Sequence, residues 1–136
     1  MGKIIRVNMS NLKIVIEETP KEYQKLGGRG LTSIIISKEV PPTCHPLGRE
    51  NKLVIAPGVL SGTNAANSSR LSVGCKSPLT GGIKESNVGG TSPFKLGRLG
   101  INAIVVEGIG EQGRWHILHL SKEGGKLIPA EEYRGL

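Results

Sequence analysis

Apolar and polar residues alternate in two short segments at the start of the chain. One segment runs from Lys3 to Val7 and the other from Lys13 to Glu17, with Met9-Ser10-Asn11 between them. Alternation with a period of two is typical of strands that bury one face. Two such segments joined by a short linker predict an antiparallel hairpin.

Two helix signals follow the hairpin. Thr19-Pro20-Lys21-Glu22 has the order of a capping box, so a short helix is predicted that ends at Gly27-Gly28. The apolar residues of Leu31–Val40 fit one helical face, although Ile34-Ile35-Ile36 would also suit a strand. Because Pro41-Pro42 gives a natural stop, we predict a helix for the second segment.

The second half of the chain predicts strands and one further helix. Ser92-Pro93 joins an N-cap residue to a proline, so a short helix is predicted up to Leu99, with Gly100 as its C-cap. The most apolar segment, Ile101–Glu107, is expected to be a central strand. Further strands are predicted at Leu53–Ala56, Leu71–Cys75, Trp115–Leu120 and Lys126–Ile128. Together these elements predict a single domain over residues 1–136 with an α+β fold, a mixed or antiparallel sheet platform with short helices.

The stretch Leu60–Gly90 departs from this pattern because Gly, Ser, Thr and Asn dominate it. We expect it to contribute no core and to expose main-chain groups that can approach a ligand closely. Arg70 ends its first polar loop, and Asn87 opens an Asn-Val-Gly-Gly sequence at its far end. A guanidinium, a carbonyl oxygen and exposed amides suit a phosphate group and its counter-ion. A strand-edge arginine and a turn asparagine without a ligand are the alternative.

The charge balance favours an anionic ligand over a nucleic acid or a membrane. Lys and Arg outnumber Asp and Glu by 18 to 11, which gives a formal net charge of +7. The charges form no basic block, and one Trp, two Tyr and one Phe offer few rings on which bases could stack, so no nucleic-acid partner is expected. No apolar segment approaches the roughly 20 residues of a membrane span, and the N-terminus turns polar too soon for a secretory signal. We therefore expect a cytoplasmic protein without a membrane partner.

The cysteines and histidines do not predict a metal centre. Cys44 and Cys75 are the only cysteines and belong to no Cys-x-x-Cys pair, so neither a structural zinc nor an iron–sulfur cluster is expected within this chain. His116 and His119 are three positions apart on a predicted strand, which places them on opposite faces.

A glycine motif at residues 108–113 matches the dinucleotide fingerprint G-x-G-x-x-G. That fingerprint needs a helix after its last glycine, so that the helix N-terminus faces the pyrophosphate. Here Arg114-Trp115-His116-Ile117 alternates like a strand. The motif is therefore interpreted as a hairpin loop.

Several motifs, taken in order, carry a family resemblance over nearly the whole chain. They are Ile5-Arg6-Val7-Asn8, Gly27-Gly28-Arg29-Gly30-Leu31, Pro46-Leu47 with Glu50-Asn51-Lys52-Leu53, Leu60-Ser61-Gly62-Thr63, Arg70, Lys76-Ser77-Pro78-Leu79-Thr80-Gly81-Gly82, Asn87-Val88-Gly89-Gly90 and Ala103-Ile104-Val105-Val106-Glu107-Gly108. In this order and spacing the chain resembles the N-terminal domain of the tungsten-containing aldehyde ferredoxin oxidoreductases. The resemblance implies an α+β platform on which paired pterins lie.

The family resemblance also implies an activity, cofactors and site residues. Enzymes of this family bind tungsten, or molybdenum, through two pyranopterins and oxidise aldehydes to carboxylic acids, with electrons passing through a [4Fe-4S] cluster to ferredoxin. By motif position, Arg70 is implied to contact the pterin cofactor and Asn87 to help hold the Mg²⁺ that bridges the pterin phosphates. Gly89 is implied to place its backbone against the cofactor. None of the family's catalytic residues falls within these motifs.

The resemblance further implies that the chain is one part of a larger enzyme. The family's cluster cysteines and its active-site acid and histidine lie in later domains, and its platform continues past the position of Leu136, so a truncated and inactive piece is expected. Ala66 and Ser68-Ser69 replace a Pro and a Gly pair that often precede the arginine, and Thr91-Ser92 replaces an often aromatic loop, which indicates a divergent branch. The sequence is compatible with a homo-oligomer. A stand-alone phosphate- or anion-binding module and a non-catalytic subunit of a multi-subunit oxidoreductase remain alternatives.

Overall fold

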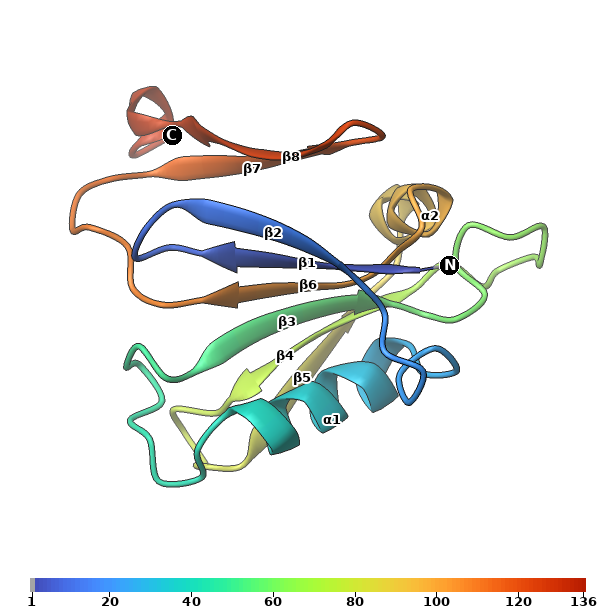
Figure 1. The fold of residues 1–136 in the computed structure, drawn as a ribbon, viewed down its shortest axis with the longest axis horizontal. Helices are drawn as coiled ribbons and strands as arrows, with labels where there is room; N and C mark the ends of the chain where they lie inside the picture. Colours follow the sequence, from blue (N-terminus) through green and yellow to red (C-terminus); the bar gives the residue numbers. More distant parts are fainter. Residues whose placement is uncertain (1) are drawn as a thin grey trace.

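The computed structural model describes residues 2–136 and shows a large sheet between two covering layers (Figure 1). The elements, in chain order, are β1 (Lys3–Asn8), β2 (Lys13–Glu18), α1 (Gly28–Glu39), β3 (Lys52–Pro57), β4 (Leu71–Lys76), β5 (Ile83–Val88), α2 (Thr91–Arg98), β6 (Ile101–Glu107), β7 (His116–Ser121), β8 (Gly124–Pro129) and a final turn of 3₁₀ helix, η1 (Glu131–Tyr133).

The large sheet has six strands in the order β2-β1-β6-β3-β4-β5. Strands β1 and β6 run parallel, and the other neighbours in this sheet are antiparallel. The predicted N-terminal hairpin is confirmed, with Ile5 opposite Ile16. Strand β6 lies between β1 and β3, as predicted for the most apolar segment. With β7 and β8 as a separate two-stranded sheet, the mixed α+β architecture is confirmed.

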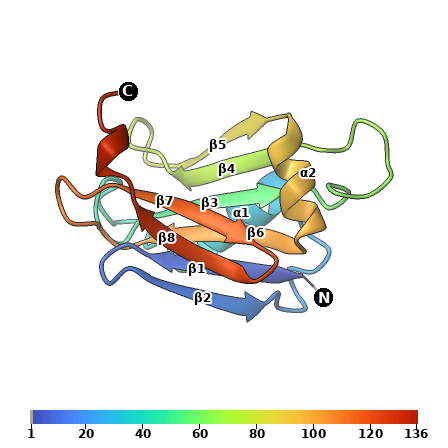
Figure 2. The same cartoon turned by 90° about the horizontal axis from the view of Figure 1, so that it is seen from above.

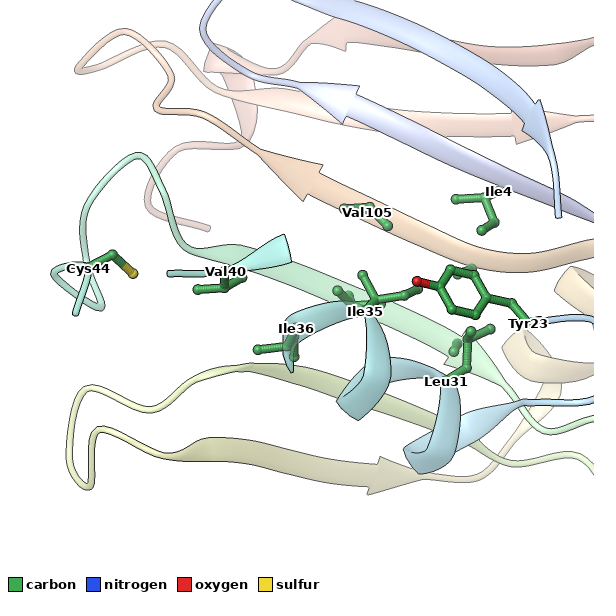
Figure 3. Packing of buried hydrophobic residues seen from close by; sticks show 11 residues of the cluster. Ile4, Tyr23, Leu31, Ile35, Ile36, Val40, Cys44 and Val105 are labelled. Carbon is green, nitrogen blue, oxygen red and sulfur yellow. The ribbon is translucent and has the colours of Figure 1, made fainter. Parts of the chain in front are cut away.

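Helix α1 covers one face of the large sheet, while α2 and the β7–β8 hairpin lie on the other face (Figures 1 and 2). Successive residues of β1 point to opposite faces of the sheet and contribute to both core clusters. Ile4 packs in the cluster under α1, and Ile5 packs in the cluster on the opposite side. Figure 3 shows the first cluster, in which Leu31 and Ile35 of α1 lie against Val105 of β6. Full burial of each of these aliphatic side chains stabilises the fold by about 1.5–3 kcal/mol.

The close approach of α1 to β4 depends on Gly74. A Cβ at this position would lie 2.9 Å from Cβ of Thr32, which is fully buried in the first turns of α1. A larger residue would therefore push the helix away from the sheet. Helix α1 starts at Gly28, three residues earlier than the predicted Leu31, and the prediction of a helix in this segment is confirmed.

The segment from Thr19 to Gly27 forms turns, so the helix predicted from the capping box is wrong. The main-chain N–H of Tyr23 donates to Pro20 O, and that of Leu26 donates to Tyr23 O. Among the described residues the buried Thr19 hydroxyl has no hydrogen-bond partner, so it does not act as a cap. Burial of the Tyr23 ring stabilises the turns, and this tertiary contact outweighs the local helix signal.

The glycine motif at residues 108–113 joins two sheets, so its interpretation as a hairpin loop is wrong. Strand β7 pairs with β8, with Leu118 opposite Leu127, and does not pair with β6. Both sides of β6 are already occupied by β1 and β3, so β7 must leave the large sheet. The two predicted strands are confirmed, and a strand follows the last glycine of the motif.

The polar stretch Leu60–Gly90 contains two strands, contrary to the expectation that it contributes no core. Strand β4 buries Leu71 and Ser72, and Gly74 is covered by α1. Strand β5 was not predicted because its sequence, IKESNV, has few apolar residues and a mostly exposed surface. It is held as an edge strand by its pairing with β4.

A cluster of five charged side chains joins four strands to α1. Arg6 Nε lies 2.7 Å from Glu17 Oε1, and Arg6 Nη2 lies 2.8 Å from Glu39 Oε1. Lys52 Nζ lies 2.9 Å from Glu39 Oε2 and 2.7 Å from Glu107 Oε2. Because these side chains are only partly exposed, the cluster fixes α1 against the sheet more strongly than surface ion pairs would.

The loop between α1 and β3 is held against β4 by Lys76. Its side chain is buried, and its ammonium donates hydrogen bonds to Pro42 O and to Cys44 O, the latter at 2.6 Å. Asn51 completes the attachment, because its Nδ2 donates to Lys76 O at 3.0 Å and its Oδ1 accepts from Lys76 N at 3.0 Å.

Replacing Lys76 with methionine in the full-length protein is expected to lower the free energy of unfolding by about 1–3 kcal/mol, because two loop carbonyls lose their donor. Urea denaturation measures the change. Lys84→Met is the matched control, since Lys84 is exposed on β5 and is expected to change stability by less than about 0.5 kcal/mol. Equal midpoints for the two variants would show that the ammonium does not hold the loop.

Candidate functional site

The structure brings the three predicted site residues together at one end of the β4–β5 pair. Arg70 directly precedes β4, Asn87 lies near the end of β5, and Gly89 follows that strand. Arg70 Nε donates a hydrogen bond to Asn87 Oδ1. A Cβ on Gly89 would lie 3.4 Å from Arg70 Nη1, so the absence of a side chain leaves room for the guanidinium.

The register of the sheet explains why these residues meet although 17 positions separate the first two. Strands β4 and β5 are antiparallel, and Ser72 is directly opposite Asn87. The two residues therefore point to the same face of the sheet, with their side chains close together. The turn at residues 77–82 sets this register, because Ser77 N donates to Gly82 O at 2.7 Å.

A second layer of polar side chains lies next to this pair. Ser72 is 1% exposed; its hydroxyl donates to Glu85 Oε1 at 2.6 Å and accepts from Asn87 Nδ2 at 3.3 Å. Glu85 Oε2 lies 3.3 Å from Arg29 Nη2 at the start of α1. The hydrogen bond from Ser72 holds the pKa of the Glu85 carboxyl below its usual range against the effect of burial, and Arg29 adds to this lowering.

The main-chain groups of Asn87 point away from β4, toward the free edge of the sheet. Along an antiparallel pair, residues bond to the two neighbouring strands in alternation. Arg70 O accepts from Gly58 N on the β3 side at 2.8 Å, whereas Ser77 N bonds to Gly82 on the β5 side. The odd-numbered residues of β4 thus bond to the even-numbered residues of β5. The N–H and C=O of Asn87 are left on the open side.

The loop that ends at Arg70 is tied down by short polar side chains. Ser61 is buried, and its hydroxyl lies 3.2 Å from Arg70 O and 3.4 Å from Ser68 O. The Ser68 hydroxyl bonds to Leu60 O at 3.1 Å and to Ala65 O at 2.9 Å. Serine and threonine side chains therefore hold the loop in shape through hydrogen bonds to its main chain, which explains the unusual composition of the segment.

The charge at this site is positive. Among the described residues, no carboxylate forms an ion pair with Arg70, whereas Arg6 and Arg29 both have acidic partners. Helix α2 begins nearby at Thr91, and its first turn has neither an acidic residue nor a side-chain cap. A guanidinium with free N–H groups beside exposed main-chain amides is suited to an anion such as a phosphate.

Other candidate chemistry is not assembled in the described part of the chain. Residues 2–136 hold no group of three or more His, Cys, Asp or Glu side chains arranged to bind a metal ion. Cys44 is buried in the first core cluster, Cys75 is half-buried, and neither forms a disulfide within residues 2–136. No helix in the described range has both the length and the apolar character needed to cross a bilayer.

Ser72 and Glu85 are the site residues that sequence reasoning missed. The alternation of Leu71–Cys75 puts Ser72 on the polar face of its strand, so nothing in the sequence indicated that it is buried. Glu85 gave no signal, because β5 was not predicted and its pairing with β4 was therefore unknown.

Comparison with known proteins identifies the family. Residues 4–136 match the family model described as aldehyde ferredoxin oxidoreductase, N-terminal domain. The tungsten-containing aldehyde ferredoxin oxidoreductase of Pyrococcus furiosus is 48% identical over 113 residues, which are 82% of this chain and 19% of the relative. The enzyme of the same name from Thermococcus kodakarensis is 45% identical over the same shares of both chains.

One more distant relative matches the chain in sequence, and one solved structure matches it in fold. An aliphatic sulfonate oxidoreductase, WOR-like subunit, of Pyrococcus furiosus is 28% identical over 99% of this chain and 22% of its own length. Among solved structures, the active site complex BamBC of benzoyl coenzyme A reductase in complex with 1,5 dienoyl-CoA has a TM-score of 0.92 at 27% identity, covering 98% of this chain and 20% of that one. The chain spans about a fifth of the length of the curated relatives it matches. It belongs to the aldehyde ferredoxin oxidoreductase family and corresponds to the N-terminal domain.

Proposed function

We propose that this chain is the N-terminal, cofactor-binding part of a tungstopterin oxidoreductase that oxidises aldehydes to carboxylic acids and delivers the electrons to ferredoxin. The observation that supports this most directly is the convergence of Arg70, Asn87 and Gly89 at one end of the β4–β5 pair. Relatives that match most of this chain are named tungsten-containing aldehyde ferredoxin oxidoreductases. The family match does not favour a stand-alone anion-binding module.

The chemistry of the site fits a phosphate-bearing pterin. Arg70 has one N–H engaged by Asn87, and its terminal nitrogens form a fork that matches phosphate oxygens. Gly89 lets a ligand approach both the guanidinium and the backbone. In this proposal Arg70 neutralises and orients a cofactor phosphate, and the Gly-rich backbone supports the pterin.

Asn87 offers two oxygens to a magnesium ion. Its side-chain oxygen accepts a hydrogen bond from Arg70, whereas its main-chain oxygen points to the open edge of the sheet. Mg²⁺ prefers hard oxygen ligands and keeps several waters. Because Arg70 already engages the side-chain oxygen, the main-chain oxygen is the better ligand. Asn87 would then hold Mg²⁺ beside the phosphate that Arg70 contacts.

The remaining chemistry belongs to parts of the enzyme outside this chain. The tungsten, or molybdenum, of the bound pterin supplies the two-electron redox step. The two cysteines among residues 2–136 lie in different surroundings and do not form a cluster site, so a [4Fe-4S] cluster would be held by later domains. We infer that this part alone does not turn over aldehyde. Ferredoxin and the aldehyde are partners of the whole enzyme, which we place in the cytoplasm and which is compatible with a homo-oligomer.

Replacing Arg70 with alanine in the full-length enzyme is expected to lower its tungsten content, because a charge-assisted contact to phosphate is lost. The loss of a hydrogen bond of this kind corresponds to roughly a ten- to hundredfold weaker affinity. Arg70→Lys is expected to recover only part of the tungsten, since an ammonium cannot form the planar fork. Metal analysis of the purified variants measures both effects.

The matched control is Arg114→Ala, since Arg114 is exposed in the loop before β7 and pairs only with Glu111 among the described residues. It is expected to retain the tungsten content of the unaltered enzyme. An Arg70→Ala enzyme with unchanged tungsten would overturn the assignment.

A further inference from the structure

We propose that Ser72 and Glu85 are positioning residues that hold the Arg70 guanidinium in its binding orientation through the side chain of Asn87. The inference rests on the proposed role of Arg70 as the anion-binding group. Within residues 2–136 neither residue forms a hydrogen bond to Arg70, so each would act through the hydrogen bonds that end at Asn87.

The identity of each donor and acceptor fixes the direction of this chain of hydrogen bonds. Arg70 can only donate, so the oxygen of the Asn87 amide must face it. Ionised Glu85 can only accept, so the Ser72 hydroxyl proton must point to Glu85. The Ser72 oxygen then offers its lone pairs to Asn87 Nδ2. Arg70 at one end of this series and Glu85 at the other thus require the same orientation of the Asn87 amide.

The burial of its central member makes this arrangement rigid. Ser72 is almost completely buried, with Gly28 at the start of α1 on one side and β5 on the other. Glu85 is held in turn by Arg29, which lies in the first turn of α1. Together with the Arg29–Glu85 ion pair, this series of hydrogen bonds therefore connects α1 to Arg70 across β4 and β5. A side chain at the sheet edge thus gains a fixed position from a hydrogen bond to a buried serine.

The consequence for Arg70 is a defined binding face. With Nε engaged by Asn87, the two terminal nitrogens remain for a ligand on the side of Gly89. Bidentate recognition of phosphate needs such a preset plane, because a mobile guanidinium would lose conformational entropy on binding. Ser72 and Glu85 are expected to raise anion affinity without touching the anion.

The experiment compares three variants of the full-length protein in its cofactor-free form: Ser72→Ala, Glu85→Ala and Glu85→Gln. Ser86→Ala is the matched control, because Ser86 is an exposed serine on the opposite face of β5. Its hydroxyl has Lys84 as its hydrogen-bond partner, at 3.3 Å. The rate at which phenylglyoxal modifies Arg70 is followed by peptide mass spectrometry, with and without inorganic phosphate, and melting temperatures are recorded for all variants.

In Ser72→Ala and Glu85→Ala we expect modification of Arg70 to be faster, and protection by phosphate to be weaker, by about three- to tenfold, the range that corresponds to the loss of one hydrogen bond. Glu85→Gln keeps an acceptor for Ser72 and is expected to restore most of the protection. Equal rates in Ser72→Ala and Ser86→Ala would overturn the inference. A general loss of structure would instead lower the melting temperature and leave Glu85→Gln no better than Glu85→Ala.

The two proposals fail in different ways. If Arg70→Ala retains tungsten, the proposed function fails, and the phenylglyoxal rates still decide whether Ser72 and Glu85 hold Arg70. If Arg70→Ala loses tungsten while Ser72→Ala leaves both the modification rate and the phosphate protection unchanged, the function stands and the positioning role fails.

Discussion

Replacing Gly97 with alanine is expected to lower the free energy of unfolding by about 3 kcal/mol, at the upper end of the usual cost of overpacking. Helix α2 crosses the loop before Arg70 at Gly97, with no space between the two backbones. A Cβ there would lie 2.5 Å from the carbonyl carbon of Ser61, closer still to its oxygen, and 2.9 Å from Gly62 N. Backbone atoms cannot swing aside as a flexible side chain would, so either the loop or the helix must move.

Helix propensity predicts the opposite sign for this substitution. Alanine stabilises a helix interior by about 1 kcal/mol relative to glycine, and Gly97 lies within α2. The clash decides the outcome, because it acts on the main chain of Ser61, whose side-chain hydroxyl donates to Arg70 O. The variant is therefore expected to lose tungsten as well as stability.

Urea denaturation of the full-length protein measures the effect, with Gly110→Ala as the control. A Cβ at Gly110 would meet only the side chain of Met9, at 3.8 Å, which is an ordinary contact. This control is expected to change the midpoint very little. Equal urea midpoints for Gly97→Ala and Gly110→Ala would show that the loop at Ser61 can move away from the new methyl group without loss of stability.

Replacing Arg6 with methionine is expected to lower the free energy of unfolding by about 2–3 kcal/mol. The substitution leaves Glu17 without its partner and removes two hydrogen bonds from Glu39. Loss of one partner from a fully buried pair costs about 3–5 kcal/mol, and the Arg6 side chain is 21% exposed, so a smaller value applies. Arg114→Met, in an exposed pair with Glu111, is the control and is expected to change stability by less than about 1 kcal/mol.

The effect of Arg6→Met is expected to depend on pH. Burial raises the pKa of Glu39, but hydrogen bonds from Arg6 and Lys52 outweigh it, so the pKa in the folded protein is below its ordinary value. A depressed carboxyl pKa stabilises the fold above the unfolded value of about 4.3, and this stability is lost as the pH falls through the folded pKa. The difference between Arg6→Met and the unaltered protein should therefore shrink in acid. A difference that stays constant from pH 7 to pH 3 would contradict the role of Glu39.

Sequence reasoning located most strands because their apolar residues have one clear period. The segment Ile101–Glu107 is apolar on both faces, as expected of a strand covered from two sides, and it lies inside the sheet. Strand β5 escaped prediction because its order comes from pairing with β4, a contact that the pattern of IKESNV does not reveal. The capping-box prediction failed for a similar reason, since burial of Tyr23 outweighs the local helix signal.

Three residues of the candidate site could be predicted from the sequence, but the hydrogen bonds that surround them could not. Arg70, Asn87 and Gly89 could be chosen from their residue types and motif positions, and the fold brings them together. The hydrogen bonds that involve Ser72 and Glu85 could not be predicted, because they depend on a strand register that brings together residues 13 to 15 positions apart. Serine and glutamate are too common for residue type alone to indicate such a role.

The pairing of β1 with β6 has a consequence for how this protein is made on the ribosome. Strand β1 ends at Asn8, whereas β6 begins at Ile101, so the N-terminal hairpin emerges long before its neighbour in the sheet. At a synthesis rate of about 5–20 residues per second, β1 waits roughly 5 to 20 s for that neighbour. During this time the apolar residues Ile5, Val7 and Ile14 of the hairpin have no sheet or β7–β8 layer to cover them. We therefore expect the nascent hairpin to expose apolar residues that chaperones can bind, and slowing translation after residue 18 should prolong that contact.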